Sequence, residues 1–195
     1  MESLKALNNR KIILASQSPR RRNLIEGLDM HVELIEVPDS DESFPKEMNP
    51  YEVPEFLASK KADCISVEID KKSILVTADT IVLCDDVVIN KPNDFSEAYQ
   101  MLSLLSDNEH IVITGVCLKS GQKKKTFSSI TKVYFAKLSS EEINYYIHKY
   151  SPYDKAGAYG IQEWIGYVGV ERIEGSFFNV MGLPLHKLYS EIINF

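Results

Sequence analysis

The chain passes from four apolar residues, 12–15, directly into Ser16, and this junction constrains the fold more than any other feature of the sequence. A short apolar run that stops at a Ser-x-Ser-Pro sequence is typical of a buried strand leading into a helix. Ser18 suits the N-cap position, and Pro19 suits the first helical position, where its missing N–H costs nothing. The sequence therefore predicts that the fold begins with a strand followed by a helix.

Three consecutive arginines, Arg20, Arg21 and Arg22, follow at the start of this predicted helix. The positive end of the helix dipole disfavours each cation there by about 0.3–1 kcal/mol. A negative ligand would compensate, and the free backbone N–H groups, the Ser16 region and the arginine forks together suit the phosphates of a polyphosphate. The alternative is a solvated arginine cluster beside acidic side chains from elsewhere in the chain.

Length and charge limit the classes of function. The 195 residues, 44% of them hydrophobic, are predicted to form a single domain over residues 1–195. A net charge of −6 argues against broad binding to nucleic acid or to an anionic membrane surface. The three widely spaced cysteines form no C-x-x-C pair, which favours a reducing, cytoplasmic environment, and no apolar segment is long enough to suggest a membrane span.

Strand and helix patterns alternate along the rest of the sequence. Strands are predicted at residues 31–37, 74–83, 111–118, 126–138 and about 167–173, and helices at about 49–66, around 98–105, from 139 to 150 and after Pro184. The two strands at 111–118 and 126–138 are joined by a predicted turn at 120–123, which introduces antiparallel pairing. The sequence therefore predicts an α/β fold with a mixed sheet.

A few polar groups stand out as candidates for chemistry. Asp79 interrupts an apolar strand, where a carboxylate needs a partner, a metal ion or the open end of the strand; a catalytic base and a structural aspartate are both compatible with this position. Lys91, in the sequence Asn-Lys-Pro, is a further cation. Asp41 and Glu42 lie in an acidic loop that could supply oxygen ligands to Mg²⁺ or Mn²⁺, although surface charge is the plainer explanation. The four histidines lack metal-binding spacing.

Six blocks of sequence, in order and at matching spacing, resemble the Maf family of nucleoside triphosphate pyrophosphatases. They are residues 16–21 (Ser-Gln-Ser-Pro-Arg-Arg), 78–82 (Ala-Asp-Thr-Ile-Val), 91–92 (Lys-Pro), 114–116 (Thr-Gly-Val), 154–162 (Asp-Lys-Ala-Gly-Ala-Tyr-Gly-Ile-Gln) and 175–184, from Gly-Ser to Gly-Leu-Pro. The resemblance covers nearly the whole chain from about Lys11. It implies a mixed α/β fold with an elongated sheet flanked by helices and two lobes around a central cleft, similar to inosine triphosphate pyrophosphatases.

The resemblance also implies an activity. Members of this family are cytoplasmic enzymes that use a divalent metal ion to hydrolyse nucleoside triphosphates to the monophosphate and pyrophosphate, and a homodimer is expected. By matching position, Asp79 is the proton acceptor, and Glu42 and Asp79 are associated with Mg²⁺ or Mn²⁺. The expected substrate-binding residues are Ser16, Arg20, Arg21, Lys61, Thr80, Lys91 and Gln162; of these, Arg20, Thr80 and Gln162 match base-discriminating positions, and Arg21, Lys61 and Lys91 match phosphate-contacting positions.

The combination of Thr80 and Gln162 resembles the subgroup that acts on dTTP and UTP, not the one that acts on 7-methyl-GTP. The sequence departs from the commoner family pattern at Asn90, at residues 151–153 and at Met181, none of which is a proposed catalytic group. An alternative function is that of a nucleotide-binding regulator of cell division, in which septum formation is controlled through a partner without significant turnover. The two hypotheses differ in whether pyrophosphate is released.

Overall fold

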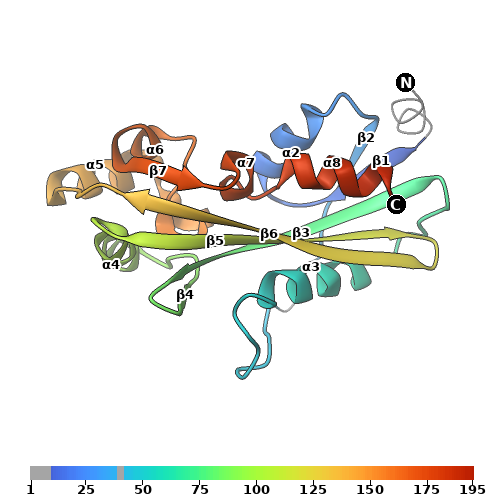
Figure 1. Ribbon diagram of the computed structural model, residues 1–195, viewed down its shortest axis with the longest axis horizontal. Helices are drawn as coiled ribbons and strands as arrows, with labels where there is room; N and C mark the ends of the chain where they lie inside the picture. The colour runs from blue at the N-terminus through green and yellow to red at the C-terminus, as the bar shows by residue number, and fades with distance from the viewer. Residues whose placement is uncertain (1–9, 39–41) are drawn as a thin grey trace. The chain divides into compact units, whose positions relative to one another are not determined.

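The computed structural model of the protein describes residues 10–38 and 42–195. Helices and strands alternate through most of this range (Figure 1). In chain order they are β1 (Lys11–Ala15), α2 (Pro19–Glu26), β2 (Val32–Ile35), α3 (Val53–Asp63), β3 (Ser73–Cys84), β4 (Val87–Ile89), α4 (Phe95–Leu105), β5 (Glu109–Ser120), β6 (Lys123–Phe135), α5 (Ser140–Tyr150), the 3₁₀ turns η1 (Pro152–Asp154) and η2 (Ala156–Ala158), α6 (Trp164–Gly169), β7 (Val170–Glu174), α7 (Phe177–Val180) and α8 (Leu185–Ile193).

The strands of the described residues form a mixed sheet in the order β2-β1-β3-β5-β6-β7, with β4 paired to β3. Strand β1 is parallel to both β2 and β3, whereas β4 is antiparallel to β3 and β7 is antiparallel to β6. Strands β5 and β6 are neighbours joined by the two residues 121–122, a connection that only an antiparallel hairpin allows. The predicted mixed α/β fold is confirmed.

The first strand and helix form as the local sequence predicts. Ser18 has extended backbone angles, and its side chain accepts a hydrogen bond from the Arg21 backbone N–H at 3.4 Å. Pro19 begins α2. The capping box at the start of α5 is also present, because Ser139 and Glu142 exchange side-chain-to-backbone hydrogen bonds. These helix ends depend on hydrogen bonds between residues three positions apart, so the residue types in the sequence predict them directly.

Several predicted boundaries were wrong. The strand predicted at 126–138 spans Lys123–Phe135, and the helix predicted to end at about Ser66 ends at Asp63. Helix α3 begins at Val53 and not near Asn49, since Pro54 is accepted only in the first helical turn, where no N–H is required. The strand predicted at 167–173 begins at Val170, because Tyr167 lies within the short helix α6. Strand β3, by contrast, runs through Asp79 without a break.

The chain divides into two compact units. The first unit comprises the described residues up to Asp79 together with Thr114–Ser129 and Gly182–Phe195, and the second comprises Thr80–Ile113 and Ile130–Met181. The boundaries fall inside β3, β5 and β6, so three strands belong to both units. The cleft and the single domain expected from the sequence stay predictions.

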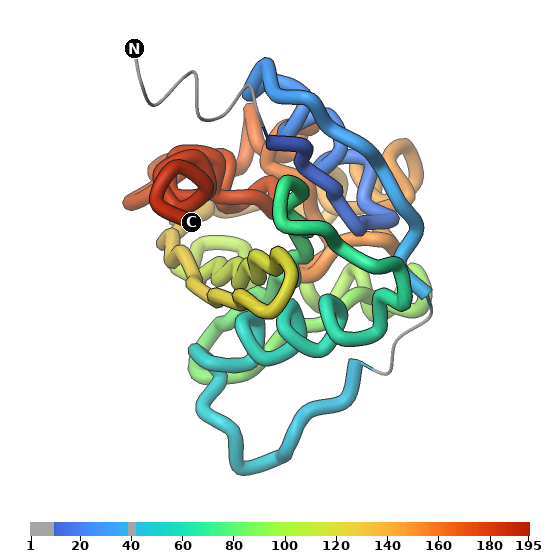
Figure 2. The backbone as a smooth tube through the Cα atoms, turned by 90° about the vertical axis from the view of Figure 1, so that its right-hand side faces the viewer, coloured from blue at the N-terminus to red at the C-terminus, as the bar shows by residue number. Residues whose placement is uncertain are grey.

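In the first unit, helices pack on both faces of the strands (Figure 1). Ile13 and Ala15 of β1 point to one face and form a core with Ala58 and Ala62 of α3. Because side chains alternate along a strand, Ile12 and Leu14 point to the other face, on the side of α2 and α8, and both are fully buried. Residues 42–52 extend from this unit as a long loop before α3 begins (Figure 2).

The core of the second unit lies between β3, β5 and β6 and the helices α4, α5 and α6. Leu102 and Leu105 of α4 and Tyr146 and Ile147 of α5 are fully buried there. Burial of this size stabilises a unit by about 1.5–3 kcal/mol for each large apolar side chain. Among the described residues, no helix combines the length and apolar character that crossing a membrane requires.

Candidate functional site

Asp79 and Lys61 form the centre of the candidate site in the first unit. Asp79 is only 8% exposed on β3, and its carboxylate accepts a hydrogen bond from the Lys61 ammonium on α3. Glu42 Oε1 lies 2.9 Å from the same Lys61 Nζ. Two carboxylates from separate segments therefore meet at one ammonium group, and the requirement that Asp79 be paired is met. Asp41, the other acid of the predicted loop, lies outside the described residues.

Helix α3 is held in the position that presents Lys61. The Thr77 hydroxyl on β3 donates a 2.6 Å hydrogen bond to the carbonyl of Ala58 on α3. At the other end of the helix, the backbone of Pro54 and Glu55 lies so close to Gly115 that a Cβ there would stand 2.2–2.4 Å from it. A glycine at 115 is required for this approach, which explains why a glycine stands in the Thr-Gly-Val block.

Two of the arginines of α2, Arg21 and Arg22, bind backbone carbonyls. Arg21 donates from Nε to the Gly182 carbonyl at 2.7 Å and from Nη1 to the Ala78 carbonyl at 2.8 Å. Burial lowers the pKa of the Arg21 guanidinium, and the nearby Asp79 carboxylate opposes that change. Arg22 donates from Nε and Nη2 to the Ser16 carbonyl. Backbone carbonyl groups of the protein therefore offset part of the unfavourable positive charge at the start of α2. The sequence did not predict these contacts.

Ser16 and Arg20 lie beside this bonded region. Ser16 is 4% exposed, and its Oγ accepts a 3.2 Å hydrogen bond from the Ser18 backbone N–H. Arg20 is partly buried and close enough to Arg21 for their charges to interact. The first unit thus brings together Ser16, Arg20, Arg21, Glu42, Lys61 and Asp79, six of the predicted site residues. Their roles toward a nucleotide stay predictions.

The donor atoms suit a divalent metal ion. In the part of the chain that the structure describes, no three His, Cys, Asp or Glu side chains gather into a metal-binding group. Mg²⁺, however, is commonly held by one or two carboxylates together with substrate phosphates and water. Glu42 and Asp79 supply two carboxylates, and both of them bind the Lys61 ammonium, so the metal site stays a prediction.

The other predicted site residues belong to the second unit. Thr80 follows Asp79 directly on β3, and Lys91 lies in an exposed turn after β4. Gln162 follows the 3₁₀ turns, and its side-chain Oε1 is buried without a hydrogen-bond partner among the described residues. A buried amide oxygen without a partner costs about 1–3 kcal/mol, so this atom is suited to a donor supplied by a ligand.

A hydrogen-bonded network lies directly next to Gln162. The Tyr146 hydroxyl on α5 donates to Glu163 Oε2 and accepts a 3.0 Å hydrogen bond from the Gly160 backbone N–H. Lys155 Nζ lies 3.2 Å from Glu163 Oε1, and Lys155 is only 7% exposed. Sequence reasoning missed this group. The pairing of Tyr146 with Glu163, 17 residues apart, has no local signal.

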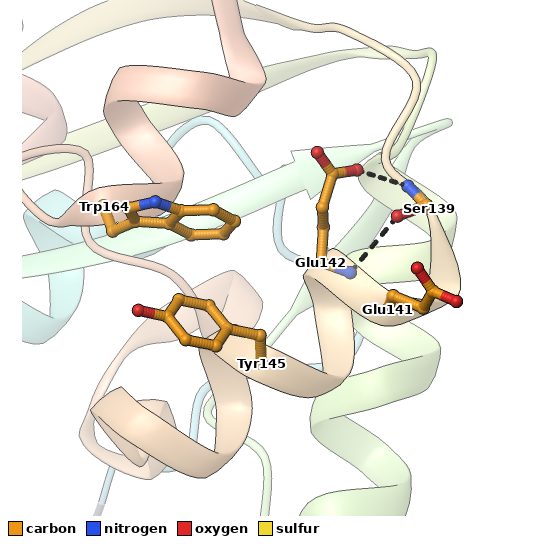
Figure 3. A pocket seen from close by; sticks show the side chains of 5 residues that line it. All are labelled: Ser139, Glu141, Glu142, Tyr145 and Trp164. Atoms are coloured by element: carbon orange, nitrogen blue, oxygen red, sulfur yellow. Dashed lines mark hydrogen bonds between the residues drawn. The ribbon is translucent and has the colours of Figure 1, made fainter.

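The surface of the second unit also carries a hollow of about 610 Å³ at the start of α5 (Figure 3). It is lined by Ser139, Glu141, Glu142, Tyr145 and Trp164. The rings of Tyr145 and Trp164 meet edge to face with centroids 4.9 Å apart. Figure 3 shows the capping hydrogen bonds between Ser139 and Glu142 at its rim. None of the predicted site residues lines this hollow.

Comparison with known families identifies the chain. The model of the family described as Maf-like protein matches residues 11–195, which include every predicted site residue. The chain belongs to the Maf family. The resemblance of the six sequence blocks is therefore confirmed over nearly the full length of the protein.

Named relatives within the Maf family are highly similar to the chain. It is 54% identical over 192 residues to a protein of Parabacteroides distasonis named dTTP/UTP pyrophosphatase, covering 98% of this chain and all of that one. A Phocaeicola vulgatus protein of the same name is 49% identical over 189 residues, covering 97% of this chain and 98% of its own length. Similarity of this extent implies a shared fold throughout.

Among solved structures, the chain is similar to a HAM1 protein from Coxiella burnetii. The TM-score is 0.53 at 15% sequence identity, with 95% of this chain and all of that chain covered. At this identity the likeness concerns the fold alone. It supports the mixed α/β architecture that the family resemblance implied.

Proposed function

We propose that this Maf-family protein hydrolyses dTTP and UTP to the monophosphate and pyrophosphate. The observation that carries the proposal is the buried Asp79 carboxylate bound to Lys61 beside Glu42. Relatives that are about half identical over their whole length and are named dTTP/UTP pyrophosphatase support the choice of substrates.

Asp79 is the proton acceptor in this proposal. A carboxylate that accepts a hydrogen bond from an ammonium group has further lone pairs that can accept a proton from an attacking water. The hydrogen bond from Lys61 fixes the position of Asp79 Oδ1, while Thr77 and Gly115 fix the helix that carries Lys61. The water attacks the α-phosphorus, the bond to the β-phosphate oxygen breaks, and pyrophosphate leaves.

Glu42 and Asp79 would hold Mg²⁺ or Mn²⁺, which would supply positive charge beside the phosphate oxygens. Lys61, Lys91 and Arg20 contribute positive charge that stabilises the leaving pyrophosphate. Arg21 binds the Ala78 and Gly182 carbonyls, and its guanidinium adds positive charge to this part of the site.

Base recognition is assigned to Thr80 and Gln162. The uracil or thymine edge offers an N–H donor between two carbonyl acceptors, and a carboxamide can pair with both kinds of group. The buried Oε1 of Gln162, which has no partner among the described residues, is suited to accept that N–H.

The experiment that tests this function measures pyrophosphate release from dTTP, UTP, CTP, the purine triphosphates and 7-methyl-GTP, with Mg²⁺ or Mn²⁺ and with a chelator. Metal-dependent release from dTTP and UTP is expected. Activity centred on 7-methyl-GTP would overturn the choice of substrate. Nucleotide binding without pyrophosphate release would instead favour a regulator.

We also propose that the protein is cytoplasmic and that it forms a homodimer. The free cysteines Cys64, Cys84 and Cys117 suit a reducing compartment. The homodimer is proposed because of the family resemblance. Light scattering coupled to size-exclusion chromatography measures the mass of the protein in solution. A mass near 22.2 kDa in solution would overturn the homodimer.

A further inference from the structure

We propose that Glu163 is a positioning residue that fixes the positions of the oxygen and nitrogen of the Gln162 carboxamide. Tyr146 and Lys155 hold Glu163 in place. The fixed amide orientation then distinguishes uracil and thymine from cytosine. The inference rests on the proposed function, because it concerns how Gln162 reads the base. It assigns a role to residues of α5 and of the 154–163 loop that the sequence did not single out.

The chemical problem is that a carboxamide is nearly symmetric. Uracil and thymine present an N–H donor beside carbonyl acceptors, whereas cytosine presents an acceptor nitrogen beside an amino donor. A glutamine pairs with either pattern if its amide rotates by 180°, since that rotation exchanges its oxygen and nitrogen. Gln162 therefore discriminates between these bases only if its amide is held in one orientation.

Gly160 shows how close the amide and the Glu163 carboxylate lie. A Cβ placed on Gly160 would stand 2.8 Å from Gln162 Nε2, 2.9 Å from Glu163 Cδ and 3.1 Å from Glu163 Oε1. The side chains of Gln162 and Glu163 therefore both lie close to the Cα of Gly160, which carries no side chain. The amide nitrogen carries the positive end of the amide dipole, and it lies on the side of the carboxylate.

The electrostatic consequence is a preferred orientation. The Glu163 carboxylate attracts the Nε2 end of Gln162 and repels the Oε1 end, and the Lys155 ammonium, 3.2 Å from Glu163 Oε1, opposes part of this effect. The Oε1 atom is buried and has no hydrogen-bond partner among the described residues. That is the atom which a base N–H would meet.

The carboxylate is itself held from two sides. Tyr146 is fully buried and donates its hydroxyl proton to Glu163 Oε2, while the Tyr146 hydroxyl oxygen accepts a 3.0 Å hydrogen bond from the Gly160 N–H. Lys155 lies 3.2 Å from the other oxygen, Oε1. Tyr146 therefore links both ends of the Gly160–Glu163 segment, and the carboxylate cannot turn without breaking these contacts.

The test compares kcat/KM for UTP with kcat/KM for CTP in Glu163→Gln and Tyr146→Phe. Glu163→Gln keeps the shape of the side chain and removes its charge, so the UTP preference is expected to fall by about tenfold while kcat on UTP changes by less than about threefold. Tyr146→Phe keeps the buried ring and is expected to reduce the preference in the same direction. Tyr146→Phe therefore still tests the proposal if Glu163→Gln does not fold.

Tyr145→Phe is the matched control. It removes a hydroxyl from the neighbouring residue of α5, where Tyr145 accepts a hydrogen bond only from Lys149 among the bonds described and contacts Trp164. Its UTP preference is expected to equal that of the unchanged protein. An equal loss in both Tyr145→Phe and Tyr146→Phe would overturn the proposal, because it would indicate a general effect on α5.

Gln162→Ala separates this inference from the proposed function. If Gln162→Ala loses the UTP preference and Glu163→Gln keeps it, the positioning role is overturned and base reading by Gln162 stands. If Gln162→Ala keeps the preference, base reading by Gln162 fails and the positioning role fails with it. A uniform loss of kcat on both nucleotides in Glu163→Gln and Tyr146→Phe would also overturn the proposal, because it indicates a purely structural role.

Discussion

Arg21 Nη1 lies 2.8 Å from the carbonyl oxygen of Ala78, the residue immediately before Asp79 on β3. The same guanidinium binds the Gly182 carbonyl at 2.7 Å. An arginine that the sequence places at a helix start is thus joined to the backbone of the candidate catalytic strand and to the segment that leads into α8. The planar guanidinium, with its several donors, binds both carbonyls at once.

Replacing Arg21 by alanine is expected to lower the free energy of unfolding by about 1–3 kcal/mol, because two carbonyls lose their donor. Urea denaturation measures the change. Arg172→Ala is the control, since its guanidinium is exposed on β7 and pairs with Glu174, a kind of contact worth about 0–1 kcal/mol. If both variants unfold at the same urea concentration, the carbonyl contacts of Arg21 contribute nothing.

Asp79→Asn is expected to reduce kcat for dTTP by about 10²–10⁴-fold, because the amide cannot accept the proton of the attacking water. Pyrophosphate release measures kcat, and calorimetry with a non-hydrolysable nucleotide should show binding largely retained. Asp85→Asn, at an exposed position just after the same strand, is the matched control and should keep full activity. Undiminished turnover in Asp79→Asn would remove Asp79 as the base.

His110 is expected to make the second unit less stable in acid. Burial lowers the pKa of His110 from 6.5 to about 4, while its Nε2 lies 2.7 Å from the Tyr159 hydroxyl. The neutral form is favoured in the folded state, so stability is full above pH 6.5 and falls as the pH drops toward 4. At 1.36 kcal/mol for each pKa unit, the loss approaches about 3 kcal/mol.

Chemical denaturation between pH 7 and 4 measures this loss, and His110→Gln should show a shallower dependence because it has no proton to gain. His31→Gln, at an exposed position, should retain the slope of the unchanged protein. Parallel curves for His110→Gln and the unchanged protein would show that the acid sensitivity comes from other groups.

Gly115→Ala is expected to destabilise the protein by about 1–3 kcal/mol and to lower activity, because the new methyl group overlaps the backbone at Pro54 and Glu55. Helix α3 must then move, and with it Lys61. Thermal unfolding and pyrophosphate release measure the two effects. Gly27→Ala is the control, since its Cβ would meet only the Leu24 carbonyl at 3.4 Å, and it should be close to neutral.

Much of the fold was predictable because its signals are local. The N-cap at Ser18 and the capping box of Ser139 and Glu142 join groups three residues apart, so the residue types alone record them. The hairpin between β5 and β6 and the mixed sheet were also predicted. The start of α3 was placed too early, since the periodicity of apolar residues does not show where the first turn begins.

The candidate site was predictable as a set of residues and not as an arrangement. The resemblance to the Maf family indicated Asp79 and Gln162 within the six blocks and Lys61 outside them, and the family match over residues 11–195 confirms the membership. The pattern of charges did not show that Arg21 binds carbonyls. It also did not show that Tyr146 and Lys155 hold Glu163 beside Gln162.

The sequence by itself determined the alternation of helices and strands, the helix caps and the family, because these depend on residue type and on neighbours within a few positions. Only the tertiary structure decided which charges meet. Lys61 reaches Asp79 across 18 residues and Arg21 reaches Gly182 across 161. Contacts at such separations depend on how whole helices pack against the sheet, and no short stretch of sequence encodes that geometry.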